Sequence, residues 1–167
     1  MSRQTAHDLV LRESRLSEES RLQEWLELWD PDGLYWIPIG DPVGPDEKTV
    51  AIVRDTLPEL RERVARLESG LVHSQIPPSR WSRVWGPLDV RPVDEGSVPD
   101  EGGSKATWEV RGNFHVVEMR RGQRKDWAGR AEYLLGTPEG SSTLRLLRKT
   151  VWLVDRDVAL PPLMFLI

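Results

Sequence analysis

The chain has 167 residues, which is the length of one domain with a core of its own. Apolar residues make up 38% of it and charged residues 30%, as in a globular protein with a well-solvated surface. Because cysteine is absent, the sequence excludes disulfides, thiolate chemistry, Cys-ligated zinc and an iron–sulfur cluster held by this chain. No apolar run is long enough to span a membrane, and the N-terminus lacks the apolar core of a signal peptide, so a cytoplasmic protein is expected.

The net charge of −4 hides an asymmetry along the chain. Residues 1–70 hold 9 basic and 15 acidic residues, whereas residues 105–150 hold 10 basic and 5 acidic residues. Such a split can be complementary within one domain or between copies of it. The arginines of the second region alternate with apolar positions, so nucleic-acid binding is not expected. Eight tryptophans indicate a large core or a subunit interface, since Trp buries a large area and still needs a partner for its N–H group.

The first part of the chain, about residues 1–72, has mainly helical patterns. Leu22, Trp25, Leu26 and Trp29 lie on one face of a helix that Ser17 is expected to cap. Asp30-Pro31-Asp32-Gly33 is typical of a turn, and Pro38 favours an edge position for the strand that follows. The elements predicted here are helices over 6–16, 17–29 and 57–67, and short strands over 34–39 and 49–53.

Residues 73–80, His73-Ser74-Gln75-Ile76-Pro77-Pro78-Ser79-Arg80, form a predicted corner between two halves of the chain. Two consecutive prolines fix φ near −65° and remove two backbone donors, so the segment suits neither a helix interior nor a central strand. We therefore expect a rigid, extended connection at which the helical half ends and the sheet half begins.

Residues 81–157 have the alternating pattern of strands. The predicted strands are 81–93, 106–119, 125–135 and 144–154, and Arg121-Gly122 is a predicted turn. Hairpin-length connections indicate an antiparallel arrangement. The sequence thus predicts a single α+β domain, with N-terminal helices packed in the concavity of a curved, mostly antiparallel mixed sheet. The tail over 158–167 is too apolar to remain in water, so it is expected to dock on the domain or on a partner subunit.

Candidate catalytic residues are few. His7, His73 and His115 are far apart in the sequence and lack metal-ligand spacing, so no metal is expected on this chain. The sequence contains no nucleophile elbow and no phosphate-binding glycine motif. A pocket in a cone of sheet and helices could still use a carboxylate or imidazole with a shifted pKa. The conceivable acid–base groups, for which capping, turn or surface roles are the more frequent, are Asp30, Asp32, His73, Asp89 and His115.

Four segments resemble one protein family over nearly the whole chain. They are the run from Glu24-Trp25-Leu26-Glu27-Leu28-Trp29 into Asp32-Gly33-Leu34-Tyr35-Trp36-Ile37-Pro38, the helix Leu60–Leu67, the corner with His73-Ser74-Gln75 and Pro77-Pro78-Ser79-Arg80, and the strand Leu147–Asp155. This pattern is similar to that of the small (beta) subunit of bacterial aromatic-ring-hydroxylating dioxygenases. The proline corner at this distance from the Arg-Val-Ala-Arg-Leu helix is the most specific part of the likeness.

The resemblance implies a cone-shaped fold like that of nuclear transport factor 2, scytalone dehydratase and ketosteroid isomerase. It also implies an assembly of three small and three large subunits, in which copies of this chain contact one another. The large subunit would hold a Rieske 2Fe-2S cluster and a mononuclear iron, and the small subunit, without cofactor or catalytic centre, would be structural. Electrons from NAD(P)H would reach the complex through separate carriers, and an arene would become a cis-dihydrodiol.

Two kinds of function follow from the sequence. In the first, the chain is a structural subunit whose expected interface residues are Pro77, Pro78, Ser79, Arg80, Trp81, Arg83, Trp85 and Phe165. In the alternative, it is a stand-alone cone-fold isomerase or dehydratase that uses an Asp or His in its pocket. A third possibility is a homomeric binding module without a large partner.

Overall fold

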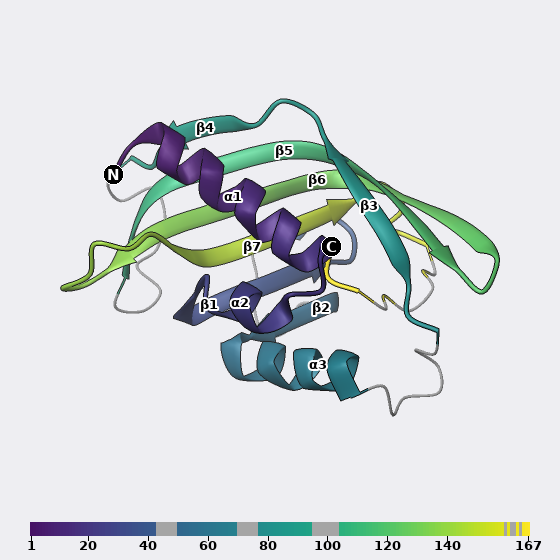
Figure 1. Cartoon of the computed structure of the whole chain (residues 1–167). Coiled ribbons are helices and arrows are strands. Elements are labelled where there is room, and N and C mark those ends of the chain that lie inside the picture. Colours follow the sequence, from purple (N-terminus) through teal and green to yellow (C-terminus); the bar gives the residue numbers. More distant parts are fainter. Residues whose placement is uncertain (43–49, 70–76, 95–103, 159, 161–162, 164) are drawn as a thin grey trace.

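The structure is a computed structural model that describes residues 1–42, 50–69, 77–94, 104–158, 160, 163 and 165–167. Its helices and strands follow one another as α1 (Arg3–Glu18), α2 (Leu22–Leu26), β1 (Trp29–Pro38), β2 (Ala51–Thr56), α3 (Leu57–Ser69), β3 (Arg80–Trp85), β4 (Asp89–Pro92), β5 (Ser104–Arg120), β6 (Gln123–Pro138) and β7 (Arg145–Leu153). Figure 1 shows a strongly curved sheet with α1 lying across it and α3 beside β1 and β2.

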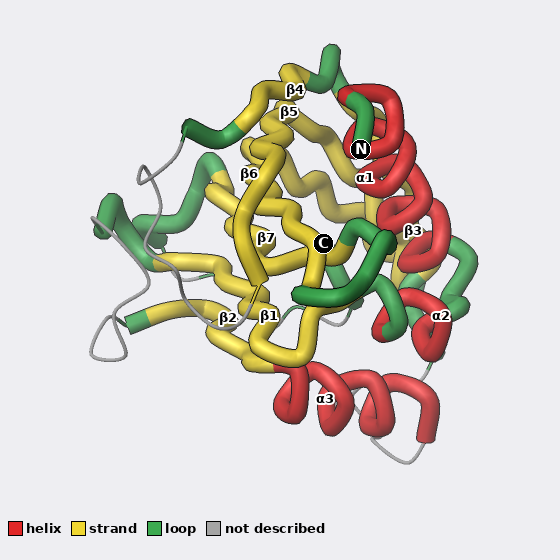
Figure 2. Tube along the Cα trace, turned by 90° about the vertical axis from the view of Figure 1, so that its left-hand side faces the viewer, coloured by secondary structure: helices red, strands yellow, loops and turns green. Residues whose placement is uncertain are grey.

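The strands form one sheet in the order β2-β1-β7-β6-β5-β3, and β4 also pairs with β5. The pairs β3–β5, β5–β6 and β6–β7 are antiparallel, whereas β1 and β7 are parallel. Seen along the other direction, the helices gather on one side of this sheet (Figure 2). The predicted α+β fold, with helices in the concavity of a mixed and mostly antiparallel sheet, is confirmed.

The first helix begins earlier and ends later than the sequence pattern indicated. Ser2 caps α1 by accepting a 3.2 Å hydrogen bond from the Thr5 backbone N–H. The prediction that Ser17 caps the second helix was wrong. Ser17 lies in the last turn of α1, where its hydroxyl donates to the Ser14 carbonyl at 2.9 Å, a bond that serine readily makes inside a helix.

The predicted turn at Asp30–Gly33 is also wrong, because these residues lie within β1. The pairing of β1 with β7 shifts between Trp29 and Leu34, so the strand continues through an irregularity instead of ending. A Cβ atom at Gly33 would lie only 2.9 Å from the Asp30 carbonyl oxygen, so this position has room for glycine but not for a larger residue. Nor is β1 an edge strand, since it lies between β2 and β7; Pro38 is tolerated as its last residue, where the register with β2 shifts.

The segment predicted as one strand over 81–93 is two strands, β3 and β4, separated by Gly86-Pro87-Leu88. Both pair with β5, because the proline interrupts the ladder without removing the chain from the sheet edge. The predicted turn at Arg121-Gly122 is confirmed by the positive φ values of 49° and 74° at these two residues.

The C-terminal segment packs on the chain's own domain. Phe165, Leu166 and Ile167 are 8%, 2% and 1% exposed, and the Tyr35 hydroxyl donates to the Ile167 carbonyl at 3.0 Å. The apolar tail was expected to dock on the domain or on a partner subunit, and the structure shows its last three residues packed on the domain. Within the described residues, no helix is long and apolar enough to cross a membrane.

Candidate functional site

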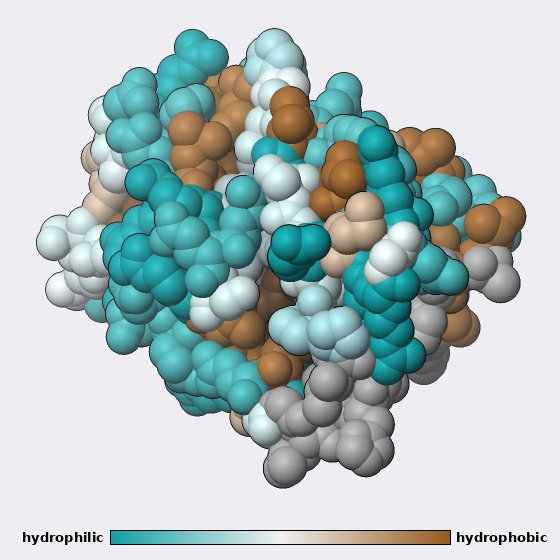
Figure 3. All heavy atoms as spheres, turned by 45° about the vertical axis from the view of Figure 1, so that its right-hand side comes forward, coloured by the Kyte–Doolittle hydropathy of each residue, from teal (hydrophilic) through white to brown (hydrophobic). Residues whose placement is uncertain are grey.

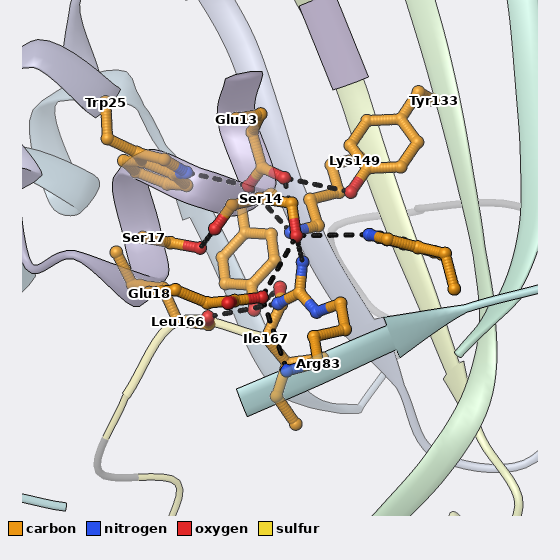
Figure 4. A network of polar contacts seen from close by, with 12 residues as sticks. Glu13, Ser14, Ser17, Glu18, Trp25, Arg83, Tyr133, Lys149, Leu166 and Ile167 are labelled. Atoms are coloured by element: carbon orange, nitrogen blue, oxygen red, sulfur yellow. Dashed lines mark hydrogen bonds and ion pairs between the residues drawn. The ribbon is translucent and has the colours of Figure 1, made fainter. Parts of the chain in front are cut away.

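Three charged side chains from distant parts of the chain meet inside the cone (Figure 4). Glu13 comes from α1, Arg83 from β3 and Lys149 from β7, and all three side chains are fully buried. Lys149 Nζ lies 2.8 Å from Glu13 Oε1, and Arg83 Nη1 lies 3.8 Å from Glu13 Oε2. This cluster, with the groups that hydrogen-bond to it, is called the Glu13 network below.

Neutral donors complete the surroundings of the Glu13 carboxylate. The Trp25 indole N–H donates to Oε1 at 2.7 Å, and the Tyr133 hydroxyl donates to Oε2 at 3.0 Å. Together with Lys149, these groups give the buried carboxylate three hydrogen bonds. A buried charge needs such partners, because each unsatisfied lone pair would add to its desolvation cost.

Burial and the neighbouring charges shift the pKa values of the ionisable groups in the network. Burial alone would raise the pKa of Glu13, but the positive charges of Lys149 and Arg83 outweigh it and hold that pKa below its ordinary value. Burial lowers the pKa of Lys149 to about 8, with Glu13 opposing this shift. Burial likewise raises the pKa of Tyr133. An ionised carboxylate that is already saturated with donors suits a structural ion pair better than a general base.

Arg83 connects β3 to α1 and to the C-terminal segment. Its Nη1 donates to Ser14 Oγ at 3.3 Å and its Nη2 donates to the Leu166 carbonyl at 3.4 Å. The guanidinium lies 5.3 Å from the ring centre of Trp81 and 5.2 Å from that of Trp85, within the range of cation–π attraction. Arg83 therefore holds three separate segments together inside the chain.

The expected interface residues fall into two groups. Arg83 and Phe165 are buried, and Phe165 packs against Trp81 with ring centroids 4.8 Å apart. Trp81 and Trp85 are half-buried beside them, with one side of each turned to the core. Pro77, Pro78 and Arg80 are exposed at the start of β3, and Ser79 is half-buried.

The described end of the predicted corner, Pro77 to Arg80, is hydrogen-bonded to β5. The Ser79 hydroxyl donates to Glu118, and Arg120 Nε donates to the Pro77 carbonyl at 3.1 Å. Next to the corner, Val84 projects from β3 with 68% of its surface exposed. Pro77, Pro78, Arg80 and Val84 are exposed here, and together with half-buried Trp81, which packs against Phe165, they are called the β3 rim below.

Three of the candidate acid–base residues, Asp30, Asp89 and His115, have a partner in the structure, and Asp32 is exposed. Asp30 is 2% exposed and accepts hydrogen bonds from Ser104 Oγ at 2.7 Å and from the Asp32 backbone N–H at 3.0 Å. Asp89 pairs with Arg91 on β4, and half-exposed His115 pairs with Asp126 at 2.9 Å. His73 lies outside the described residues. Among the described residues, no three His, Asp or Glu side chains are grouped so as to hold a metal ion.

The sequence analysis missed Glu13 and Lys149. Periodicity contained a signal for both, since Glu13 falls on the same helix face as Ala6 and Val10, and Lys149 alternates in phase with Val151 and Leu153. An ionisable residue at an apolar position of the pattern is a candidate for a buried pair. Only the fold shows that these two residues face each other.

Comparison with known proteins shows which proteins this chain is similar to. A model of the ring hydroxylating beta subunit family matches residues 12–159. The small oxygenase component of the p-cumate 2,3-dioxygenase system of Pseudomonas putida is 25% identical over 156 residues, 92% of this chain and 79% of that protein. The 2-halobenzoate 1,2-dioxygenase small subunit of Burkholderia cepacia is 27% identical over 148 residues, 85% of this chain and 82% of that protein.

Solved structures agree with the fold. The beta subunit of benzoate 1,2-dioxygenase from Burkholderia mallei superposes with a TM-score of 0.65 at 20% identity, covering 90% of this chain and 89% of that one. A nuclear transport factor 2-like protein with a cystatin-like fold from Novosphingobium aromaticivorans superposes with a TM-score of 0.59 at 16% identity, covering 92% and 82%. The chain therefore belongs to the beta subunit family of aromatic-ring-hydroxylating dioxygenases.

Proposed function

We propose that this chain is a structural subunit that assembles with a large subunit and leaves catalysis to it. In this proposal the large subunit holds the Rieske 2Fe-2S cluster and the mononuclear iron, and three copies of each chain form the complex in the cytoplasm. Electrons from NAD(P)H enter through separate carriers that contact only the assembled complex.

The Glu13 network is the observation that carries this proposal. In a cone-fold enzyme the interior between helices and sheet is the place for a substrate pocket. Here Trp25, Tyr35, Tyr133, Glu13 and Lys149 fill that space, and each is at most 1% exposed. These side chains are closely packed and mutually hydrogen-bonded, and the Glu13 carboxylate is already paired, which supports a role without catalysis.

The alternative, a stand-alone isomerase or dehydratase, finds less support. Such an enzyme needs a carboxylate or imidazole that faces a substrate space. Asp30 is occupied by Ser104, and His115 lies on a half-exposed surface beside Asp126. Neither side chain belongs to the Glu13 network.

For the contact with the large subunit, we propose the β3 rim. Its members are exposed or half-exposed, include a Trp and an Arg, and lie on a backbone fixed by the corner hydrogen bonds. Trp and Arg are enriched at the centres of interfaces. Arg83, Trp85 and Phe165 support the rim from below, and Ser79 fixes the corner to β5.

We further propose that the complex acts on an aromatic carboxylate. The two relatives named above belong to oxygenases of p-cumate and 2-halobenzoate, and both substrates are substituted benzoates. Oxygen uptake by the reconstituted complex should therefore be faster with substituted benzoates than with neutral arenes of the same size. The reverse order would contradict this substrate class.

A tagged pull-down tests the structural role. The tagged chain should recover a larger partner in about equimolar amount, with iron and a Rieske-type visible spectrum in the eluate. After the two subunits are separated, the iron should remain with the large one. A colourless, iron-free protein without a partner would overturn the proposal and favour the cone-fold enzyme.

A further inference from the structure

An open cleft of about 940 Å³ lies at the end of the sheet where β1 and β7 begin. Pockets that hold small molecules commonly measure about 300–1,000 Å³. Residues from the first part of α1, the start of β1, the start of α3 and the start of β7 line the cleft. The Leu146 backbone N–H donates to the Leu28 carbonyl at 2.9 Å, which fixes the starts of β1 and β7 to each other. The cleft is therefore a hollow of ligand size on a hydrogen-bonded frame.

Much of the lining of this cleft is apolar. Its apolar lining residues include Leu9, Leu26, Leu28, Trp29, Leu57 and Leu144. Hydrophobic residues also reach the surface on the β3 side of the molecule, where they lie between hydrophilic ones (Figure 3). Since an apolar group at the surface is thus not special to the cleft, the polar groups of the lining decide which ligand it suits.

Three arginines from different elements line the cleft. Arg12 comes from α1, Arg61 from α3 and Arg145 from β7. Among the described residues, none of these three guanidiniums has a carboxylate within ion-pair distance. Glu24, on which Arg12 acts at longer range, is bound to Arg21 at 2.6 Å. The three guanidiniums therefore keep their hydrogen-bond donors for an anion. The hollow is called the arginine cleft below.

Two acidic residues, Asp8 and Glu27, also belong to the described lining. Asp8 accepts a 2.7 Å hydrogen bond from Gln4 and lies 3.4 Å from His7 Nδ1. Three positive and two negative side chains leave one positive charge in excess among the described lining residues. A ligand with a single negative charge would balance this excess.

Trp29 adds a hydrogen-bond donor that has no acceptor. Its side chain is 3% exposed and lines the arginine cleft, and within the described part of the chain its indole N–H has no hydrogen-bond partner. The neighbouring Trp25, by contrast, donates to Glu13 at 2.7 Å. A buried donor without an acceptor lowers stability, so an oxygen atom brought by a ligand would be favourable beside Trp29.

We propose that the arginine cleft binds one molecule of an aromatic carboxylate, with its ring on the apolar lining and its carboxylate among the arginines. A carboxylate accepts two parallel hydrogen bonds from one guanidinium, and a flat ring packs well on indole and guanidinium planes. This site goes beyond the proposed function, because it gives the small subunit a ligand of its own. It rests on that function only for the choice of a benzoate as the probe.

Nuclear magnetic resonance of the full chain measures this binding directly. Each of the eight tryptophans has an indole N–H signal, and the assigned signal of Trp29 reports on the cleft. Titration with benzoate should shift this signal to saturation. Benzamide lacks the charge and acetate lacks the ring, so each should bind at least about tenfold more weakly than benzoate.

Variants of the arginines locate the binding site. Arg61→Gln with Arg145→Gln removes two charges from the cleft and should weaken benzoate binding by more than about tenfold. Arg12→Gln, a single change of an exposed residue, should act in the same direction. The matched control is Arg15→Gln with Arg66→Gln, because these exposed arginines of α1 and α3 lie outside the described lining, and it should bind benzoate like the wild type. Circular dichroism checks that each variant is folded.

Three results would each overturn the proposal. They are a shift of the Trp29 signal that grows without saturation, equal binding of benzoate and benzamide, and equal affinity of the cleft variants and the control variant.

Recovery of the large subunit by the tagged wild-type chain separates this site from the proposed function. Saturable benzoate binding by a chain that recovers no large partner would support the site and overturn the structural role. A large partner recovered by a chain that does not bind benzoate would do the opposite.

Discussion

Lys149 Nζ lies 2.8 Å from Glu13 Oε1, although the two residues are 136 positions apart in the sequence and both side chains are fully buried. Their ion pair joins the first helix to the last strand across the concavity of the sheet. A buried pair of this kind is costly to desolvate and more costly to break, since removal of one charge leaves the other unpaired.

Glu13→Gln should destabilise the chain strongly. The substitution leaves the Lys149 and Arg83 charges without their carboxylate, for which losses of about 3–5 kcal/mol in the free energy of unfolding are typical. Urea denaturation measures this loss. Glu24→Gln, which removes an exposed carboxylate that pairs with Arg21, is the matched control and should change little. Equal effects of the two substitutions would show that the Glu13 network does not stabilise the fold.

Replacing both members of the ion pair should cost less than replacing Glu13 alone. Glu13→Gln leaves the buried charges of Lys149 and Arg83 both unpaired, whereas Glu13→Gln with Lys149→Met leaves only that of Arg83, so the double variant should be more stable than Glu13→Gln. A complete double-mutant cycle, measured by urea denaturation, gives the coupling energy. Additive single effects would mean that the 2.8 Å contact carries no net interaction.

The same double variant should respond differently to acid. The pKa of Glu13 is lower in the folded chain than its ordinary value of 4.5, so the unfolded chain binds the proton first as the pH falls. The stability that this carboxylate contributes is therefore complete above its unfolded pKa and is lost as the pH falls through its folded pKa. As the pH falls through this range, the wild type should therefore lose stability relative to the double variant. A difference that is independent of pH would contradict the lowered pKa.

Arg83→Lys should loosen the C-terminal segment. Lysine lacks the planar guanidinium that lies beside two Trp rings while bonding Ser14 and Leu166, so we expect a loss of about 1–3 kcal/mol. Hydrogen exchange should become faster at residues 165–167 than in β6. Unchanged protection of these residues would indicate that their apolar packing alone holds the segment.

Arg80→Ala should weaken assembly with the large subunit without changing the iron content of the complexes that form. Arg80 is exposed at the proline corner, and loss of an arginine anchor at an interface commonly weakens binding about tenfold. Titration of the large subunit with labelled small subunit measures the dissociation constant. Arg66→Ala on the exposed face of α3 is the control. Unchanged affinity would exclude Arg80 from the interface.

The sequence by itself determined most of the architecture. Alternation over residues 106–154 fixed the antiparallel strands, because period-2 burial and short turns leave few other arrangements. The corner over residues 73–80 stays a prediction from the backbone restriction of Pro77 and Pro78, since residues 73–76 lie outside the described residues. The family resemblance also followed from sequence, since it depends on motifs that are local.

The tertiary structure decided what depends on contacts between distant segments. Gly33 lies inside a strand because β7 accommodates an irregularity there, which no local pattern reveals. The apolar tail could have docked on a partner, but Tyr35 and Arg83 supply hydrogen-bond donors for its carbonyl groups within the same chain. The pairing of Glu13 with Lys149 likewise arises only when helix and sheet enclose them, because burial makes each charge require the other.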